Sequence, residues 1–448
     1  GEVTVRPPKI ELWVGVKRAL GHPDRDYRAR SMFNSARLRF RAACSFALLI
    51  VLSVTLSGCT LGDNGLQQTN FSSGSGVEDF ARGTGSPALT TASTIRIPGS
   101  DPAANAAGAA ITVYPSSSAF TRPAATTVVG ENDWRAAIAM SVFSAPPVKA
   151  PMLLSGEGDL PDVTESAMNA LTPVGVMIPG QTLRPKAFVA GNLKLPDRTP
   201  RVNLVNTSYE NLSLAADRLW TRLTGGKPSK QVIVTTADPA FKRFALPAGP
   251  LAANTASPVF FVNKDTVPLA TLRAIAGHKK PAIYVIGPSH VISDQLLTVL
   301  RKYGNVRRIS EPNPTYNAVR VATFSDPNTE WGWGITDPGH GFVIMNSHFE
   351  MNVAAATTLA AGAAYGPLLL NSNATVVDRE LRNYLLDEQS AYIDDPSTAV
   401  YNRAWLLGDE KQLSPGIQAT FDKLLSVTQL KPEGSTGATG DSAITQTP

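Results

Sequence analysis

Cysteine is almost absent from this chain of 448 residues, which contains two, Cys44 and Cys59. Both lie near the N-terminus, so the sequence from residue 60 onward can form no disulfide framework and offers no thiolate nucleophile. Histidine is scarce too, and its spacing does not suit a zinc site. We therefore predict no metal and no cofactor. The five histidines are His22, His278, His290, His340 and His348.

Catalytic motifs are also missing from the sequence. It contains no Gly-x-Ser-x-Gly nucleophile elbow. Ser289 and His290 are a nucleophile and a base by residue type, but adjacent residues rarely face each other. We predict that the protein is not an enzyme.

The charge balance gives no sign of a nucleic-acid partner. The whole chain carries 41 Lys and Arg against 36 Asp and Glu, a net charge of +5. Residues 1–58 hold ten of the basic and four of the acidic residues, which leaves 31 against 32 for the rest. A nucleic-acid footprint needs a concentrated basic surface, so we expect no nucleic-acid binding.

The first long apolar run, Ala42–Leu56, follows Met32 and three arginines and precedes Leu-Ser-Gly-Cys59. A charged start, an apolar run of this length and small residues after it are typical of a secretory signal. A transmembrane helix is the alternative, but the run is shorter than the roughly 20 residues that a span needs. Leu-Ser-Gly-Cys resembles the bacterial lipobox, which implies cleavage before Cys59 and acylation of its sulfur.

The ends of the chain are thus expected to lie outside the folded part. We interpret 1–31 as an upstream extension, 32–58 as a lipoprotein signal peptide and 59–93 as a flexible linker, since it is rich in Gly, Ser, Thr and Asn. The polar tail 431–448 is predicted to be disordered. The acyl chains would place the protein on the outer face of the cell membrane.

The remaining sequence repeats itself three times. Three markers recur at a period of 105 to 109 residues: a Pro-led apolar run, an Arg before a β-branched residue, and an aromatic before an Ala-rich stretch. Such a period indicates a repeat architecture. We place the repeats at 94–200, 201–307 and 308–430. The markers begin at Pro151, Pro258 and Pro367; at Arg96, Arg201 and Arg308; and at Trp134, Phe241 and Phe349.

Inside each repeat, short apolar runs alternate with helical patterns. The middle repeat predicts strands over Gln231–Thr236, Val259–Val262 and Ala282–Ile286, separated by helices. Continuously apolar strands between helices favour a parallel sheet covered on both faces. The predicted fold class is therefore α/β, with three tandem flavodoxin-like or Rossmann-like repeats.

The repeats resemble the type 2 cell-wall-binding repeats of Gram-positive surface proteins. That family opens with an Arg-hydrophobic-x-Gly-x-Asp-Arg-Tyr-x-Thr-Ala phrase, of which the first repeat keeps Arg96, Gly99, Asp101 and Ala106. Pro102 replaces the second Arg. The resemblance implies that three units pack as a pseudo-trimer and hold a protein on an anionic polymer of the cell wall.

The candidate polymer-binding residues are Arg96, Asp101, Arg201 and Arg308. The three arginines are expected at one recurring structural position, where a guanidinium could contact phosphate or carboxylate groups. The alternative is an Arg that pairs locally, for example Arg96 with Asp101. Two tryptophans, Trp331 and Trp333, could stack on sugar rings or pack on a sheet edge.

These features favour a non-catalytic, lipid-anchored surface protein that bridges membrane and wall by binding an anionic or peptidoglycan-associated wall polymer. Two alternatives stay open. One is a solute-binding lipoprotein with a cleft between repeats. The other is an enzyme acting on envelope glycans, which would need paired carboxylates in a cleft.

Overall fold

A computed structural model describes residues 90–430 of the chain. The expectations for 1–31, 32–58 and 431–448, for Cys59 and for the linker up to residue 89 lie outside these residues. Within the described part, no helix has both the length and the apolar character that crossing a membrane requires.

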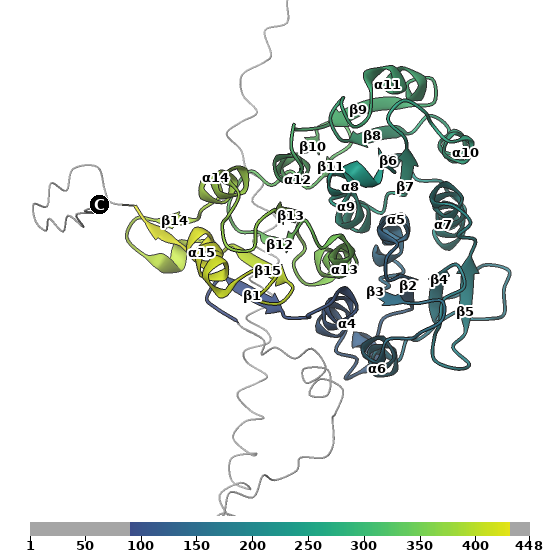
Figure 1. Ribbon diagram of the computed structural model, residues 1–448, viewed down its shortest axis with the longest axis horizontal. Helices are drawn as coiled ribbons and strands as arrows, with labels where there is room; N and C mark the ends of the chain where they lie inside the picture. The colour runs from purple at the N-terminus through teal and green to yellow at the C-terminus, as the bar shows by residue number, and fades with distance from the viewer. Residues whose placement is uncertain (1–89, 431–448) are drawn as a thin grey trace, which may run out of the picture. The chain divides into compact units, whose positions relative to one another are not determined.

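The described residues contain three parallel four-stranded sheets, each the centre of one subdomain (Figure 1). All three have the same strand order: apart from one closing strand at the edge, the earliest strand along the chain is flanked by the next two. The predicted α/β class with parallel sheets is confirmed. In order across each sheet, the first subdomain has β3 (Met152–Ser155), β2 (Thr126–Gly130), β4 (Ala187–Ala190) and β5 (Arg201–Leu204); the second has β7 (Val259–Val262), β6 (Gln231–Thr236), β8 (Ala282–Ile286) and β9 (Asn305–Ile309); the third has β13 (Leu368–Asn371), β12 (Gly341–Asn346), β15 (Arg403–Leu407) and β1 (Thr94–Ile97).

The last strand of each sheet belongs to the following sequence repeat. Strands β5 and β9 pair in parallel with β4 and β8, and so complete the sheet before them. The third sheet is completed by β1 from the other end of the described chain, which pairs with β15 (Figure 1). Sequence repeats and sheets are therefore offset by one strand, and β1 closes the set of three sheets.

A crossover helix follows each of these closing strands and packs on the next subdomain. Helix α4 (Pro102–Val113) contacts β3, α7 (Tyr209–Leu223) contacts β7, and α12 (Pro314–Thr323) contacts β13. Each begins at a side chain that caps its first turn, Asp101, Ser208 or Asn313. Such caps satisfy backbone N–H groups that the helix leaves free. Each closing strand and its helix thus tie two neighbouring subdomains together.

The remaining helices cover the sheets. Longer helices pack with an apolar face toward the strands, while short 3-10 turns connect them. The first subdomain has η2 (Ala119–Thr121), α5 (Trp134–Ala139), η3 (Ser141–Ser144) and α6 (Asp162–Leu171); the second has η4 (Pro239–Phe241), α8 (Lys242–Ala245), α9 (Ala248–Thr255), α10 (Leu269–Gly277) and α11 (Asp294–Leu300); the third has η5 (Glu350–Asn352), α13 (Val353–Gly362), α14 (Arg379–Asp387), η6 (Pro396–Thr398) and α15 (Pro415–Leu425).

The Ala-rich helices of the three subdomains meet one another. Helix α13 contacts both α9 and η3, and α9 contacts η3 (Figure 1). At the meeting point, a Cβ on Gly249 would lie 3.0 Å from Ser141 Oγ and 3.0 Å from Thr357 Oγ1. These three residues come from three different subdomains, so Gly249 allows the helices to approach closely. One buried apolar cluster accordingly includes residues of all three subdomains.

Small additions join the subdomains at their margins. Two short antiparallel strands, β10 (Ser325–Asp326) and β11 (Trp331–Gly332), form a hairpin, and β14 (Ala391–Tyr392) pairs with β16 (Thr428–Gln429). In the hairpin, the ring of Trp331 stacks on Tyr284 with centroids 3.7 Å apart, and its indole N–H donates to Ser257 Oγ at 2.9 Å. The buried Trp331 therefore packs a loop onto the second subdomain, at the internal strand β8 and not at the sheet edge that the sequence suggested.

Candidate functional site

Arg96 is buried at the carboxyl end of the third sheet, with 4% of its surface exposed. Its Nη1 donates to the carbonyl oxygens of Gly408 at 2.8 Å and Asp409 at 3.1 Å, and its Nε donates to Gln418 Oε1 at 2.8 Å. Burial lowers the pKa of Arg96, and the carboxylates of Glu410 and Asp409 partly oppose that effect. This Arg ties β1 to the loop after β15.

Arg308 makes the same contacts in the second sheet. Its Nη1 donates to the carbonyl oxygen of Gly287 at 2.6 Å, and its Nη2 donates to Ile292 O at 2.7 Å and to Asp294 Oδ1 at 3.0 Å. Gly287 and Gly408 both follow the third strand of their sheet with positive φ, 130° and 104°. Arg96 and Arg308 therefore bind groups of their own sheet, as the alternative of an Arg that pairs locally predicts. The partners of Arg96 are Gly408, Asp409 and Gln418, and not Asp101.

Arg201 does not share this position, and the expectation of one position for all three arginines is wrong. In the strand register, Arg96 faces Leu406 and Arg308 faces Val285, each one residue before the strand end. The equivalent residue in the first sheet is Asn203, because it faces Val189. Arg201 lies two residues earlier and is exposed. The sequence marker selected Arg201 and Val202, but the strand register places Arg201 two residues before the position that Arg96 and Arg308 occupy.

Asp101 has a structural contact of its own. Its carboxylate accepts a hydrogen bond of 2.9 Å from the backbone N–H of Ala104, which caps α4. Nearby, Asn105 accepts from the N–H of Gly99 at 2.9 Å, and Asn317 accepts from Glu311 at 3.0 Å in the third repeat. The phrase that the sequence repeats thus shapes the turn between closing strand and crossover helix.

The sequence did not single out the places where subdomains meet at the carboxyl ends of their strands. At two of them, the segment that carries the aromatic marker of one subdomain approaches the crossover helix and edge strand of the next. We call these contacts junctions. Junction 1–2 joins α5 to α7 and β7, and junction 3–1 joins η5 to α4 and the loops after β2 and β3.

Junction 1–2 is filled by aromatic rings and one guanidinium. The rings of Trp134 and Phe261 meet edge to face at 6.1 Å, and Tyr209 meets Phe261 at 5.8 Å. The guanidinium of Arg135 lies 4.7 Å from the ring of Trp134 and 5.4 Å from that of Tyr209. Its Nε donates to the carbonyl oxygen of Ala237 at 2.8 Å. Stacking, cation–π attraction and a hydrogen bond close this junction.

Junction 3–1 instead encloses a groove of about 560 Å³. Strand registers and helix caps allow the two junctions to be aligned position by position. The groove lies where junction 1–2 places its large side chains. Tyr209, Phe261, Trp134, Arg135 and Ala237 correspond to Pro102, Leu154, Glu350, Met351 and Glu131, all of which line the groove.

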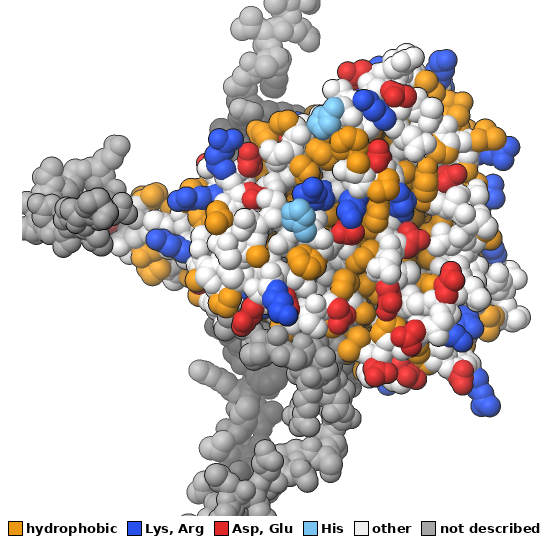
Figure 2. Space-filling view, in the orientation of Figure 1, with side chains coloured by type: hydrophobic (Ala, Val, Ile, Leu, Met, Phe, Trp, Pro, Cys, Tyr) orange, Lys and Arg blue, Asp and Glu red, His pale blue; other side chains and the backbone are white. Residues whose placement is uncertain are grey.

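The groove is acidic. Asp101, Asp159 and Asp162 line it together with Glu131 and Glu350, and no Lys or Arg is among its lining residues. Acidic side chains gather over α4, α6 and the first sheet on this face of the molecule (Figure 2). A second groove of about 600 Å³ shares Glu131 and continues along the end of the first sheet. Its other polar lining residues are Asn132, Asp133, Ser155, Glu157, Asn192 and Asn206.

One carboxylate that lines the groove is paired with another subdomain. Glu350 of the third subdomain forms an ion pair with Lys242 of the second. Beside it, Phe349 keeps 37% of its surface exposed. The corresponding Phe241 instead packs on Phe244 and His290 inside its own subdomain, at 6.5 and 5.8 Å. The aromatic marker thus has a different role in each subdomain.

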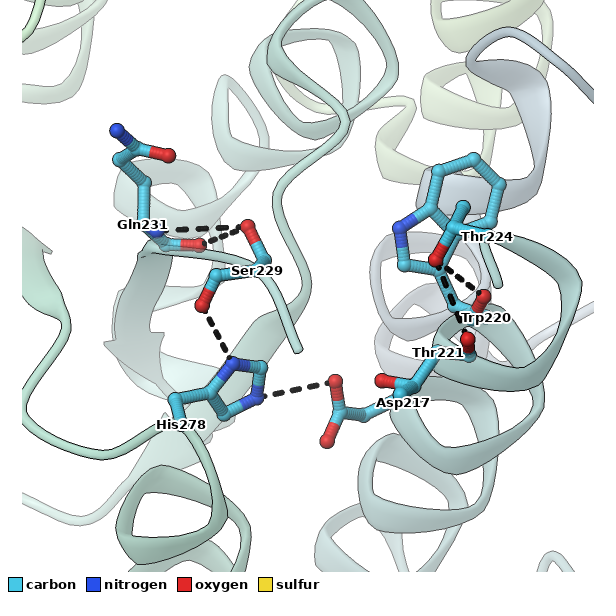
Figure 3. A network of polar contacts seen from close by, with 7 residues as sticks. All are labelled: Asp217, Trp220, Thr221, Thr224, Ser229, Gln231 and His278. Carbon is cyan, nitrogen blue, oxygen red and sulfur yellow. Dashed lines mark hydrogen bonds and ion pairs between the residues drawn. The ribbon is translucent and has the colours of Figure 1, made fainter. Parts of the chain in front are cut away.

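A buried histidine and carboxylate lie on the far side of α7 (Figure 3). His278 Nε2 lies 3.1 Å from Asp217 Oδ1, and its Nδ1 lies 2.8 Å from the carbonyl oxygen of Ser229. Because both ring nitrogens face acceptors, the protonated imidazolium fits best. Burial lowers the pKa of His278, but the hydrogen bond and charge of Asp217 and the Ser229 carbonyl together outweigh it, so the pKa is raised. The pair clamps α7 to α10.

Among residues 90–430, no group of three or more His, Cys, Asp and Glu side chains is placed to hold a metal ion. The carboxylates of the groove come from four separate segments of the chain.

Comparisons with known proteins agree on the fold. No protein-family model matches the chain. It is 35% identical over 105 residues to the amidase enhancer of Bacillus subtilis (strain 168), which covers 23% of this chain and 14% of that protein. It resembles Cwp6 from Clostridium difficile with a TM-score of 0.58 at 17% identity, over 75% of this chain and 48% of that one. For Cwp8 from the same organism the values are 0.53, 12%, 75% and 52%.

The chain therefore spans a small part of the curated relative and about half of each solved structure. At these identities the likeness to Cwp6 and Cwp8 shows a shared fold of parallel α/β subdomains. The resemblance to type 2 cell-wall-binding repeats stays a prediction.

Proposed function

We propose that this protein is a non-catalytic cell-wall-binding protein of a bacterial surface, in which three subdomains pack as a pseudo-trimer. The observation that carries the proposal is the fold, in which three sheets of one strand order are closed by β1. Cwp6 and Cwp8, which share this fold, are cell wall proteins. The close approach of three Ala-rich helices at Gly249 supports the pseudo-trimeric packing.

The proposed ligand is a polymer of the wall, and the proposed location is outside the cytoplasm. Three subdomains in one chain offer several weak sites to a repeating polymer, which raises the apparent affinity through effective concentration. We further propose that acylation at Cys59 holds the protein on the outer face of the membrane, so that it bridges membrane and wall. The lipobox-like Leu-Ser-Gly-Cys is the support for this part.

The test measures how much of the protein, produced as residues 59–448, is retained on purified cell walls. The walls are used before and after their secondary polymers are extracted. We expect retention on intact walls and its loss after extraction. Equal and negligible retention on both would contradict wall binding. Radiolabelled palmitate incorporation into the complete chain, compared with Cys59→Ala, tests the anchor separately.

One observation favours a second candidate, a solute-binding lipoprotein. The groove at junction 3–1 lies at the carboxyl ends of parallel strands, where α/β folds commonly hold small ligands. A thermal shift with small solutes but no retention on walls would favour this candidate over wall binding.

A further inference from the structure

Junction 3–1 is a copy of junction 1–2 from which the filling side chains have been removed. The Tyr and Phe that close junction 1–2 are replaced by Pro102 and Leu154, which are shorter. The buried Trp134, 5% exposed, is replaced by Glu350, and Phe349 beside it keeps 37% of its surface exposed. A junction that needed only to hold two subdomains together would gain from the larger apolar contact. The open copy therefore leaves room, about 560 Å³, for something else.

The residues around this space suit a sugar ring. An exposed aromatic face offers an apolar platform beside polar groups, and binding sites of this kind combine apolar surface with a few polar groups that fix orientation. Across the groove from Phe349, the carboxylates of Glu131, Asp159 and Asp162 accept hydrogen bonds, as hydroxyl and amino groups of a saccharide require. Within residues 90–430, these three carboxylates have no hydrogen bond or ion pair from any side chain.

The charge of the groove selects among saccharides. The position that carries the cation Arg135 in junction 1–2 carries the neutral Met351 here, and the position of Trp134 carries the anion Glu350. Lys242 is already paired with Glu350. A phosphate or carboxylate in this groove would face five acidic side chains, and the lining residues include no Lys or Arg and one histidine, His348. Like charges at such an interface are unfavourable, whereas an ammonium group is attracted.

We infer that junction 3–1 binds a saccharide that carries a protonated amino group, with the ring against Phe349 and the ammonium among Glu131, Asp159 and Asp162. The second groove, which shares Glu131 and Asn132, extends the site along the first sheet, so that an oligosaccharide is accommodated. This inference rests on the proposed wall binding and names the class of wall sugar that this junction takes. It departs from the anionic polymer that the sequence suggested.

Isothermal titration of the chain without residues 1–58 tests the inference with three probes: a glucosamine tetramer, an N-acetylglucosamine tetramer and a glycerol phosphate oligomer. We expect the glucosamine tetramer to bind at least about tenfold more tightly than either of the others, a difference of about 1.4 kcal/mol. Higher salt is expected to weaken this binding, because the attraction is electrostatic.

Three variants locate the site. The double substitution Glu131→Gln with Asp159→Asn and the single Phe349→Ala are each expected to reduce affinity at least about tenfold. Pro102→Tyr, which copies junction 1–2, is expected to block the groove. The matched control is Glu165→Gln, which removes an exposed carboxylate of α6 that does not line the groove. Circular dichroism checks that each variant folds; the exposed carboxylates hold no contact that the fold needs.

The outcomes separate this inference from the proposed function. Tighter binding of the glycerol phosphate oligomer, or equal loss of affinity in Glu165→Gln and in the double variant, would overturn it. Retention on walls without any glucosamine binding would also overturn it while leaving wall binding intact. Glucosamine binding without wall retention would instead count against wall binding and leave the groove as a saccharide site.

Discussion

Junctions 1–2 and 3–1 occupy equivalent places in the fold but differ in what fills them. In junction 1–2, Trp134, Arg135 and Tyr209 form a packed, hydrogen-bonded contact. In junction 3–1, smaller and acidic residues leave a groove in which Phe349 is partly exposed. The comparison shows that the same backbone arrangement can hold two subdomains tightly together at one junction and leave an open groove at another. Which role a junction takes depends on a few side chains.

The largest expected effect comes from truncating the aromatic marker in the closed junction. Trp134→Ala should lower the free energy of unfolding by about 3–5 kcal/mol, because it removes a buried ring and leaves a cavity. Phe349→Ala at the open junction should cost less than about 1.5 kcal/mol, since the ring is already partly hydrated. Urea denaturation of both variants measures the difference. Equal losses would show that the two junctions stabilise the fold alike.

A further expected effect concerns the buried pair of His278 and Asp217, which connects α7 to α10. Asp217→Asn should cost about 3 kcal/mol at pH 6, because it leaves the charged His278 buried without its partner. The raised pKa of His278 means that its protonated form stabilises the fold. That contribution is fully present below the usual pKa near 6.5 and is lost as pH rises through the raised value. The cost of Asp217→Asn should therefore shrink at pH 9, as calorimetry at both pH values would reveal.

A smaller effect is expected at the charged position of each junction. Arg135→Met should cost about 2 kcal/mol, because it removes the hydrogen bond to Ala237 and the cation–π contacts. Glu350→Gln, at the charged residue of junction 3–1, should cost no more than about 1 kcal/mol, since it loses one partly exposed ion pair. Chemical denaturation of the two variants provides the measurement. A larger loss for Glu350→Gln would reverse the comparison.

The smallest expected effect comes from closing the open junction. Pro102→Tyr places a ring beside Phe349 and should stabilise the fold by about 0.5–1 kcal/mol. Differential scanning calorimetry would record this as a small rise in Tm. A clear fall in Tm would mean that the groove has no room for the ring, and that the two junctions differ in backbone as well as in side chains.

Local patterns in the sequence predicted the elements well. The Pro-led apolar runs at Pro151, Pro258 and Pro367 each introduce a buried strand, in the same register with the strand beside it. Apolar runs and their helical neighbours depend on nearby residues, so the sequence reveals them. The Ala-rich stretches after the aromatic markers are helical, as the alternation of apolar runs and helical patterns predicts. Two of them are not continuous helices. The stretch after Trp134 divides into α5 and η3, and that after Phe241 divides at Pro247.

The candidate site was less accessible to sequence reasoning. Arg96 and Arg308 stood out because they recur, yet each donates to carbonyl groups of its own sheet. The groove residues did not stand out, because they are brought together from four segments of the chain that share no motif. An alignment of Tyr209 with Pro102 and of Trp134 with Glu350 would have been the signal, but it needs the strand register first.

The sequence by itself determined the period of the repeats, the α/β class and the parallel strands, because each depends on spacing and on local apolar pattern. Only the tertiary structure decided that each closing strand completes the sheet before it, that Asn203 rather than Arg201 matches Arg96, and that junction 3–1 is open. These properties depend on which distant segments pair. Pairing follows from the packing of the whole chain, and β1 with β15, from opposite ends of the described residues, is its plainest instance.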